Sequence, residues 1–293
     1  MQSITIRERQ FILRCSKADY RSRDRAALIY DIDGNIKSIY LERSEEKAQT
    51  VNTAVGVLDC EMVTFYPNGN LHRVFPVYGK ISGFWSEEEE VNLLPVTYLK
   101  NKDITFHGKI SCVCFYPDES LKSITLWPGE ETSVFVNEKE YKIRYGISFY
   151  ESGAIKSFEP AVPVKITQKA GTFYAYDFMA TGVTGDFTSL CFYEDGCVRS
   201  LKSNVTGLLI RDKKGVVQEF YPPLVVNPLD IESEVLFPVR YEFSDEGITF
   251  LDSVGKVWKF LYENFEIKAK QLFEDESRSC NTLCSGNCDK CHK

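Results

Sequence analysis

The sequence has no apolar run long enough to cross a membrane, since a spanning helix needs roughly 20 mostly apolar residues and charged residues interrupt every such stretch. The opening residues, MQSITIRERQFILRC, also carry charges where a secretory signal has its apolar core. We therefore expect a soluble, cytoplasmic protein.

Residues that usually build enzyme centres are also scarce. The chain has 3 histidines, His72, His107 and His292, and none of them falls in a pattern with a nucleophile and an orienting acid. No glycine cluster follows a strand and opens a helix, as a phosphate-binding loop requires. The sequence therefore predicts a protein that is not an enzyme.

An excess of positive charge is missing too. Lys and Arg number 35 against 42 Asp and Glu, which gives a formal net charge of −7. This balance opposes attraction to nucleic-acid phosphates and to anionic lipids. Three acids, Glu8, Asp19 and Asp24, interrupt the basic residues between Arg7 and Arg25, and an ordinary solvated face explains this segment best. We expect the partner to be another protein, with no nucleic acid and with a membrane unlikely.

Aromatic and β-branched residues are plentiful instead. The chain has 20 Phe and 16 Tyr, and 43% of its residues are apolar. Such residues suit the pleated, half-buried surface of a sheet, so the composition indicates an all-β fold.

One stretch organises the chain, residues 63–85, VTFYPNGNLHRVFPVYGKISGFW. Asn68 and Gly69 form a tight-turn signal between two strands, because this dipeptide readily supplies positive φ. Copies of the strand, turn and strand recur at intervals of roughly 34 to 50 residues, a period typical of repeat proteins. The five copies are residues 30–38, 65–73, 115–123, 149–157 and 192–200.

Alternation along the strands assigns each repeated position to a face. Val63 and Phe65 and their counterparts form one apolar face, and Cys114 and Cys191 occupy a small-residue position on the other. The tyrosines after the strands also repeat. Either they are structural, with cross-strand partners, or they form a face that binds carbohydrate or another ligand; they are Tyr66, Tyr116, Tyr150 and Tyr193.

A second glycine motif is present in several copies. Tyr78-Gly79-Lys80, His107-Gly108-Lys109 and Tyr145-Gly146 predict a second turn that leads into the next hairpin. The intervening segments, such as 87–90 and 129–139, are predicted loops. Residues 257–273 fit a strand pair or a short helix equally well.

The motif FYPNG, an aliphatic residue, and then G-K-x-x-G-x-W resembles the MORN-repeat variant found in bacterial proteins, some of them labelled putative antitoxins. Residues 68–85 match it in full, and half-units extend over residues 30–260, with Glu119 in the place of a turn glycine. The resemblance implies a meandering antiparallel sheet used as an interaction surface, with membrane association proposed for the wider class. It implies no catalytic residues.

The C-terminal segment has a different character. Cys280, Cys284, Cys288 and Cys291 give the pattern C-x3-C-x3-C-x2-C. Four thiolates at such spacings suit Zn²⁺ or an iron–sulfur cluster, and His292 is a substitute ligand for one of them. Disulfides and unbound thiols remain the alternatives.

Together these observations predict repeated antiparallel β-hairpins in residues 1–265, forming an elongated meander or open solenoid-like sheet, followed by a Cys-rich segment in residues 266–293. The predicted function is a non-enzymatic scaffold for protein–protein interaction. The alternative is a metal-binding protein whose four-cysteine cluster is the functional centre.

Overall fold

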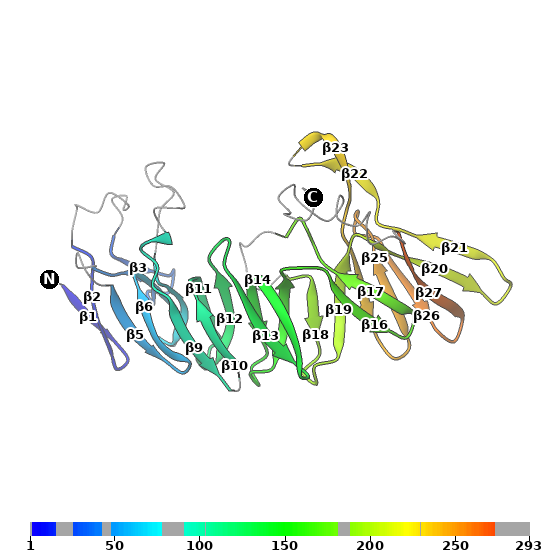
Figure 1. The fold of residues 1–293 in the computed structure, drawn as a ribbon. Helices are drawn as coiled ribbons and strands as arrows, with labels where there is room; N and C mark the ends of the chain where they lie inside the picture. Colours follow the sequence, from blue (N-terminus) through cyan, green and yellow to red (C-terminus); the bar gives the residue numbers. More distant parts are fainter. Residues whose placement is uncertain are drawn as a thin grey trace. The chain divides into compact units, whose positions relative to one another are not determined.

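A computed structural model of the protein describes residues 2–15, 26–42, 48–77, 91–102, 104–180, 188–228 and 230–272. Every element named in these ranges is a β-strand, and the strands pair in antiparallel fashion (Figure 1). The all-β prediction is therefore confirmed, as is the use of successive hairpins. The elongated or solenoid-like form stays a prediction.

The chain divides into two compact units. Unit 1 comprises Met1–Phe158 and Thr181–Phe187, and unit 2 comprises Glu159–Ala180 and Thr188–Lys293. Each unit has a main sheet and a second layer of strands.

The main sheet of unit 1 contains the repeated hairpins. Its strands follow one another across the sheet in chain order. They are β3 (Leu28–Tyr30), β4 (Ile36–Tyr40), β7 (Met62–Phe65), β8 (Leu71–Phe75), β11 (Ile110–Phe115), β12 (Leu121–Leu126), the C-terminal part of β14 (Lys139–Phe149), and β15 (Ile155–Pro160), whose last two residues belong to unit 2.

The same turn closes these hairpins. In the turn after β7, the amide of Gly69 donates to the carbonyl of Tyr66 (2.8 Å), and the amide of Tyr66 donates to the carbonyl of Asn70 (2.9 Å). The fourth turn residue has positive φ, +83° at Gly34, +82° at Gly69 and +84° at Gly153. Glycine reaches this conformation without a Cβ penalty, which is why it marks the repeats in the sequence.

A second layer lies against this sheet, built from hairpins that alternate with the main ones along the chain (Figure 1). The loops of these hairpins have two residues, as the pairs Ile6↔Arg9 and Thr53↔Gly56 show. No repeated motif predicts these hairpins. Their strands are β1 (Ser3–Ile6), β2 (Arg9–Ile12), β5 (Gln49–Thr53), β6 (Gly56–Cys60), β9 (Thr97–Asn101), β10 (Ile104–Gly108), β13 (Glu131–Val136) and the N-terminal part of β14.

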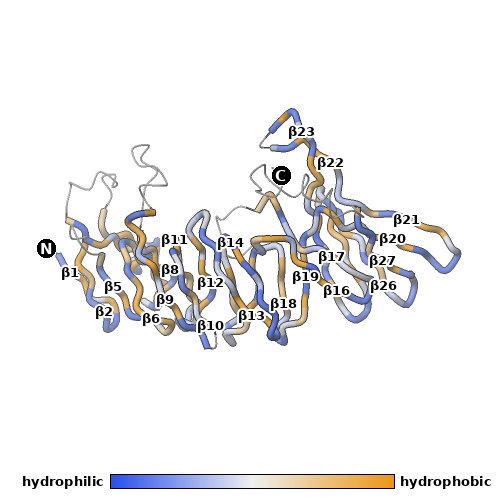
Figure 2. The backbone as a smooth tube through the Cα atoms, in the orientation of Figure 1, coloured by the Kyte–Doolittle hydropathy of each residue, from blue (hydrophilic) through white to orange (hydrophobic). Residues whose placement is uncertain are grey.

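The core of unit 1 lies between the two layers. The rings of Phe11 in β2 and Phe65 in β7 are 6.0 Å apart, and those of Tyr141 and Phe158 are 5.2 Å apart. Val63 is fully buried, as its repeat position predicts. Burying a side chain of this size contributes roughly 1.5 to 3 kcal/mol, and Figure 2 shows the matching alternation of apolar and polar residues along the strands.

Two predictions about the connections are wrong. Gly108 is the last residue of β10, and Tyr145 and Gly146 lie inside β14, so neither motif forms a hairpin turn. In β14 the chain passes from the second layer to the main sheet, and the bend occurs at Tyr145, whose φ is +62°. Residues 131–136 are strand β13 and not part of a loop, because Val134 and Val136 are buried at alternate positions. Gly79 and residues 87–90 lie outside the described residues.

Unit 2 repeats this organisation. Its main sheet contains β18 (Leu190–Phe192), β19 (Val198–Ser203), β24 (Val239–Phe243), β25 (Gly247–Leu251) and β26 (Val257–Leu261). The other strands are β16 (Val164–Gln168), β17 (Gly171–Ala175), β20 (Thr206–Asp212), β21 (Val217–Phe220), β22 (Leu224–Asn227), β23 (Asp230–Leu236) and β27 (Phe265–Gln271).

The core of unit 2 is aromatic. Phe173 in β17 lies 5.2 Å from Tyr241 and 5.0 Å from Phe243, measured between ring centroids. Phe220 in β21 contacts Phe250 and Phe260 in the same way. Residues 257–261 and 265–271 form strands β26 and β27, which excludes a helix there, but the two strands pair with β25 and β20 and not with each other.

Candidate interaction surface

Three of the repeated tyrosines, Tyr66, Tyr116 and Tyr193, link their main-sheet hairpin to the next one. The hydroxyl of Tyr66 donates to the carbonyl of Phe115, and the hydroxyl of Tyr116 donates to the carbonyl of Phe149, each at 2.9 Å. In unit 2 the hydroxyl of Tyr193 donates to Phe243 in the same way. These contacts favour the structural explanation of the tyrosines over a carbohydrate-binding face.

The rings of the three repeated tyrosines of unit 1, Tyr66, Tyr116 and Tyr150, also pack against the basic or histidine residue of their own hairpin. The ring of His72 lies 4.5 Å from that of Tyr66, and the Nζ atoms of Lys122 and Lys156 lie 5.9 and 5.8 Å from the rings of Tyr116 and Tyr150. A cation over an aromatic ring gains about 0.5 to 1 kcal/mol at an exposed site. The stacking gives a physical reason for the basic or histidine position in the repeat.

His72 differs from the lysines in its charge. Burial lowers the pKa of His72, and the positive charges of Arg73 and Lys122 lower it further. The imidazole is therefore neutral at pH 7. Arg73 lies beside it on the same strand and supplies the charge of this hairpin.

A row of small side chains, Cys114, Ser123 and Ser148, runs across the neighbouring strands of the sheet. Cys114 pairs with Ser123, and Ser123 pairs with Ser148. Arg73 is at the end of this row, where it pairs with Cys114. Ser148 and Ser157 share a hydrogen bond between their Oγ atoms at 2.6 Å. Cys114 and Cys191 are each 5% exposed, which confirms their assignment to buried small-residue positions.

Glu119 occupies the glycine position of its turn, and its side chain binds the N-terminal hairpin through Arg9. Its φ is +68°. Its carboxylate accepts hydrogen bonds from Arg9 at 2.9 and 2.6 Å, and from the backbone amide of Leu71 at 2.9 Å. The hydrogen bond from Arg9 is the main reason why the pKa of Glu119 is lowered.

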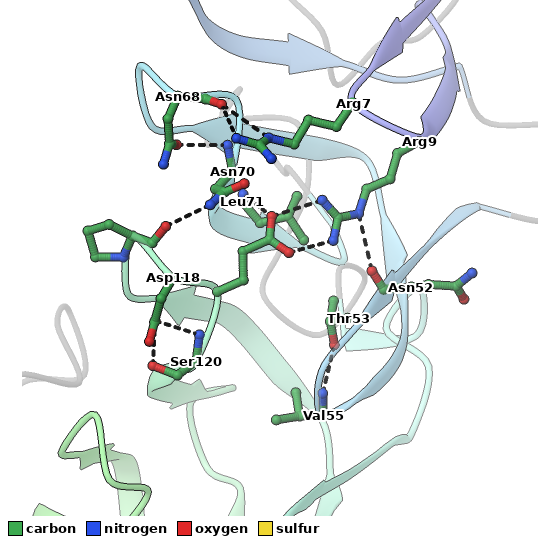
Figure 3. Close-up of polar contacts among 12 residues, drawn as sticks. Arg7, Arg9, Asn52, Thr53, Val55, Asn68, Asn70, Leu71, Asp118 and Ser120 are labelled. Carbon is green, nitrogen blue, oxygen red and sulfur yellow. Dashed lines mark hydrogen bonds and ion pairs between the residues drawn. The ribbon is translucent and has the colours of Figure 1, made fainter.

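Arg7 makes a parallel contact in the adjacent turn. Its Nη2 atom donates to the carbonyl of Asn68 at 2.8 Å (Figure 3). Arg7 and Arg9 therefore fasten the hairpin of β1 and β2 to two main-sheet turns. Arg7 is exposed, as a solvated basic face predicts, and Arg9 is half-buried. The sequence did not predict their contacts, because the partners lie 61 and 110 positions away.

Unit 2 contains two buried carboxylates with structural partners. Glu159 accepts hydrogen bonds from the amide (2.8 Å) and the Oγ atom (2.6 Å) of Ser189. Asp177 forms an ion pair with Lys202 at 2.8 Å. Sequence analysis missed both pairs, because nothing in the local sequence distinguishes these acids from the others. Both pairs join separate segments of backbone, which indicates a role in holding strands together.

The hairpin of β22 and β23 exposes apolar side chains. Among the described strands, β22 and β23 pair only with each other, and they lie apart from the other labelled strands of unit 2 in Figure 1. Leu224 and Val226 are each 57% exposed and Ile231 is 84% exposed. Asp230 and Glu234 are exposed on the same hairpin. We call this hairpin, residues 224–236, the arm.

Comparison of the chain with models of protein families, with curated proteins and with solved structures finds no match in any of the three. The resemblance to MORN-type repeats therefore stays a prediction.

The predicted metal ligands Cys280, Cys284, Cys288 and Cys291 lie outside the described residues, and so does His292. Within the described ranges, no group of three or more His, Cys, Asp or Glu side chains is arranged to hold a metal ion. In the same part of the chain, no helix is long and apolar enough to span a membrane.

Proposed function

We propose that this chain is a non-enzymatic repeat scaffold that binds another protein, and that the arm makes the contact. The observation that carries the proposal is the exposure of Leu224, Val226 and Ile231 on one hairpin. Exposed apolar residues that gather in one place mark protein interaction sites.

The structure of the arm supports this role. A two-stranded hairpin by itself is marginally stable in water, and none of the described residues of the arm, 224–228 and 230–236, is buried. The arm therefore gains little from the core of unit 2. A partner that covers the apolar side chains would supply the burial that the chain does not, at about 25 cal/mol per Å² of apolar surface.

The charges of the arm indicate what that partner looks like. Asp230, Glu232 and Glu234 are its ionisable residues, and no basic residue lies among residues 224–236. Charged groups around an interface steer association towards surfaces of opposite sign. We expect an apolar patch bordered by Lys or Arg on the partner.

A triple variant, Leu224→Ser, Val226→Ser and Ile231→Ser, tests the proposal. Val254→Ser with Val257→Ser is the matched control, because these valines are 86% and 60% exposed in the same unit but lie outside the arm. Quantitative cross-linking in the source cells should recover the same partner protein with the wild type and the control, and lose it with the triple variant. Recovery of an unchanged set of partners with the triple variant would refute the role of the arm.

The four-cysteine pattern of residues 280–291 supports a second proposal, that of a metal-binding protein holding Zn²⁺ or an iron–sulfur cluster. Its support is the spacing of the thiols in the sequence. Measurement of bound metal decides it.

A further inference from the structure

The main sheet of unit 1 has an unusual charge distribution. The chain contains 42 acidic residues, yet none of the unit 1 residues in the main-sheet strands is acidic. Basic or histidine side chains occur there once or twice in each hairpin. They are Lys37, His72, Arg73, Lys122 and Lys156.

Two acids next to these strands are buried, namely Glu61, which precedes β7, and Glu159, in the unit 2 part of β15. Other acids lie in the turns, and several of them accept local hydrogen bonds. The carboxylate of Asp31 accepts hydrogen bonds from the amides of Asp33 and Asn35, and Asp118 accepts two from Ser120. The hydrogen bonds lower the pKa of both Asp31 and Asp118. Both carboxylates therefore stay ionised in the turns, whereas the unit 1 strand positions themselves carry only basic or neutral side chains. Screening limits the reach of exposed charges to about 8 to 10 Å.

The repeat fixes the spacing of these basic side chains. Neighbouring strands lie about 4.8 Å apart, so the equivalent residues of successive hairpins, two strands apart, recur about every 10 Å. These residues are Lys37, His72, Lys122 and Lys156. His72 is neutral, and Arg73, the next residue on the same strand, supplies the charge of its hairpin. A tyrosine ring packs against the residue at this position in three of the hairpins: Tyr66 against the neutral His72, Tyr116 against Lys122, and Tyr150 against Lys156. A row of alternating aromatic and basic groups therefore runs across the strands.

An extended peptide can match this period. A polyproline II segment has three residues per turn and rises about 3.1 Å per residue, so every third side chain returns to the same side after about 9.3 Å. Aromatic surfaces are the usual docking sites for such segments. The remaining residues of each turn would lie against the tyrosine rings.

We propose that an acidic, extended segment of a protein partner, with a carboxylate at every third residue, lies across the main sheet of unit 1 over Lys37, Arg73, Lys122 and Lys156. This inference rests on the proposed function only in that the ligand belongs to a protein. Each exposed ion pair contributes less than about 1 kcal/mol. Binding therefore requires several pairs in register, and it weakens as the salt concentration rises.

Two labelled peptides of equal composition test the register. One has about four Glu-Pro-Pro repeats, with a carboxylate at the required period, and the other has the same glutamates clustered at one end. Fluorescence anisotropy with the full chain should show binding of the periodic peptide at least about tenfold tighter than binding of the clustered one. Equal affinities, or tighter binding of a single-stranded oligonucleotide of similar length, would overturn the inference.

Charge reversals locate the site. Lys37→Glu and Lys122→Glu should each weaken binding of the periodic peptide about threefold to tenfold. Lys100→Glu and Lys142→Glu make the same charge change at exposed positions of the second layer, and they should leave binding unchanged. Lys37 is itself exposed, so its reversal keeps the test decisive even where Lys122→Glu lowers the melting temperature. Equal effects of all four reversals would show nonspecific attraction and would also overturn the inference.

The triple variant of the arm distinguishes a failure of this inference from a failure of the proposed function. The triple variant of the arm should bind the periodic peptide as the wild type does, because the peptide site lies in the main sheet of unit 1. Failure of the peptide to bind, with arm-dependent capture of a partner intact, refutes this inference alone. Binding of the peptide without any arm-dependent partner refutes the role of the arm alone.

Discussion

Replacement of Glu119 by glycine should destabilise the protein, although glycine is the residue that the other turns of this type use. Glu119 has φ of +68°, while Gly69, Gly153 and Gly196 have φ between +82° and +84°. An L-residue in this left-handed region costs about 1 to 2 kcal/mol. If only the turn mattered, Glu119→Gly would stabilise the protein by that amount.

The contacts of the carboxylate reverse this expectation. Arg9 and Glu119 form a bidentate ion pair, and their side chains are 23% and 20% exposed. Glu119 also accepts a hydrogen bond from the backbone amide of Leu71. A hydrogen bond to a charged group contributes about 1.5 to 3 kcal/mol, and the exposed part of the pair is screened. We assign about 3 kcal/mol to these contacts together. With the relief of strain subtracted, Glu119→Gly should lower the free energy of unfolding by about 1 to 2 kcal/mol.

Urea denaturation at pH 7 measures this free energy, and hydrogen exchange of the amides in β1 and β2 shows where stability is lost. Gly34→Ala is the matched control for backbone strain, because Gly34 has φ of +83° and a Cβ there would contact nothing within 4 Å. The double variant with Arg9→Ala isolates the coupling between the two side chains. A Glu119→Gly protein as stable as the wild type, or more stable, would refute the assignment.

The same contacts predict a pH dependence. The pKa of Glu119 is lower in the folded state than its ordinary value of 4.5, so its contribution is fully present above that pH. The contribution is lost as pH falls through the lowered folded-state pKa. The stability difference between the wild type and Glu119→Gly should therefore shrink below pH 4.5, and a constant difference down to pH 3 would contradict the ion-pair explanation.

Three further measurements follow from the structure. Tyr116→Phe removes the hydrogen bond from the tyrosine hydroxyl to the next strand and should lower the free energy of unfolding by about 1 kcal/mol. The control Tyr98→Phe, at a residue that is 67% exposed, should change this free energy by less than about 0.5 kcal/mol. Burial raises the pKa of Cys60 to about 12. A thiol reagent at pH 8 should therefore label the exposed Cys15 and leave Cys60 unmodified until the protein unfolds. Rapid labelling of Cys60 in the native protein would contradict its burial. Elemental analysis of protein purified without oxygen should find zinc or iron that Cys284→Ser reduces, and the absence of both metals would exclude the metal-binding proposal.

Local sequence predicted the hairpins of the main sheet because the information lies within each turn. Asn68-Gly69 specifies its own positive φ and closes the turn by itself. Alternation of apolar residues then assigned Val63 and Phe65 to the core. The hairpins of the second layer have two-residue loops without a shared motif, and Arg7-Glu8 gives no signal comparable to Asn-Gly. Strand β13 escaped prediction because Gly129 and two glutamates precede its buried valines and Asn137 and Glu138 follow them, a composition typical of a loop.

The candidate surface was predictable in its residue types but not in its contacts. The repeat gave a basic residue and a tyrosine in successive hairpins, and the structure showed that Lys122 packs against Tyr116 and that Tyr116 bonds to the next strand. The arm was not predicted. Its apolar residues resemble those of any buried strand, and only their exposure in the fold distinguishes Leu224 and Ile231 from core residues.

The sequence by itself determined the all-β class, the repeated turns and the apolar face of the main sheet, because each depends on interactions between residues a few positions apart. The tertiary structure decided why Glu119 replaces glycine, since its partner Arg9 lies 110 positions away. It also decided that a second layer covers the main sheet, and where the surface stays exposed or positively charged. These properties depend on contacts between distant segments, which form only when the chain is folded.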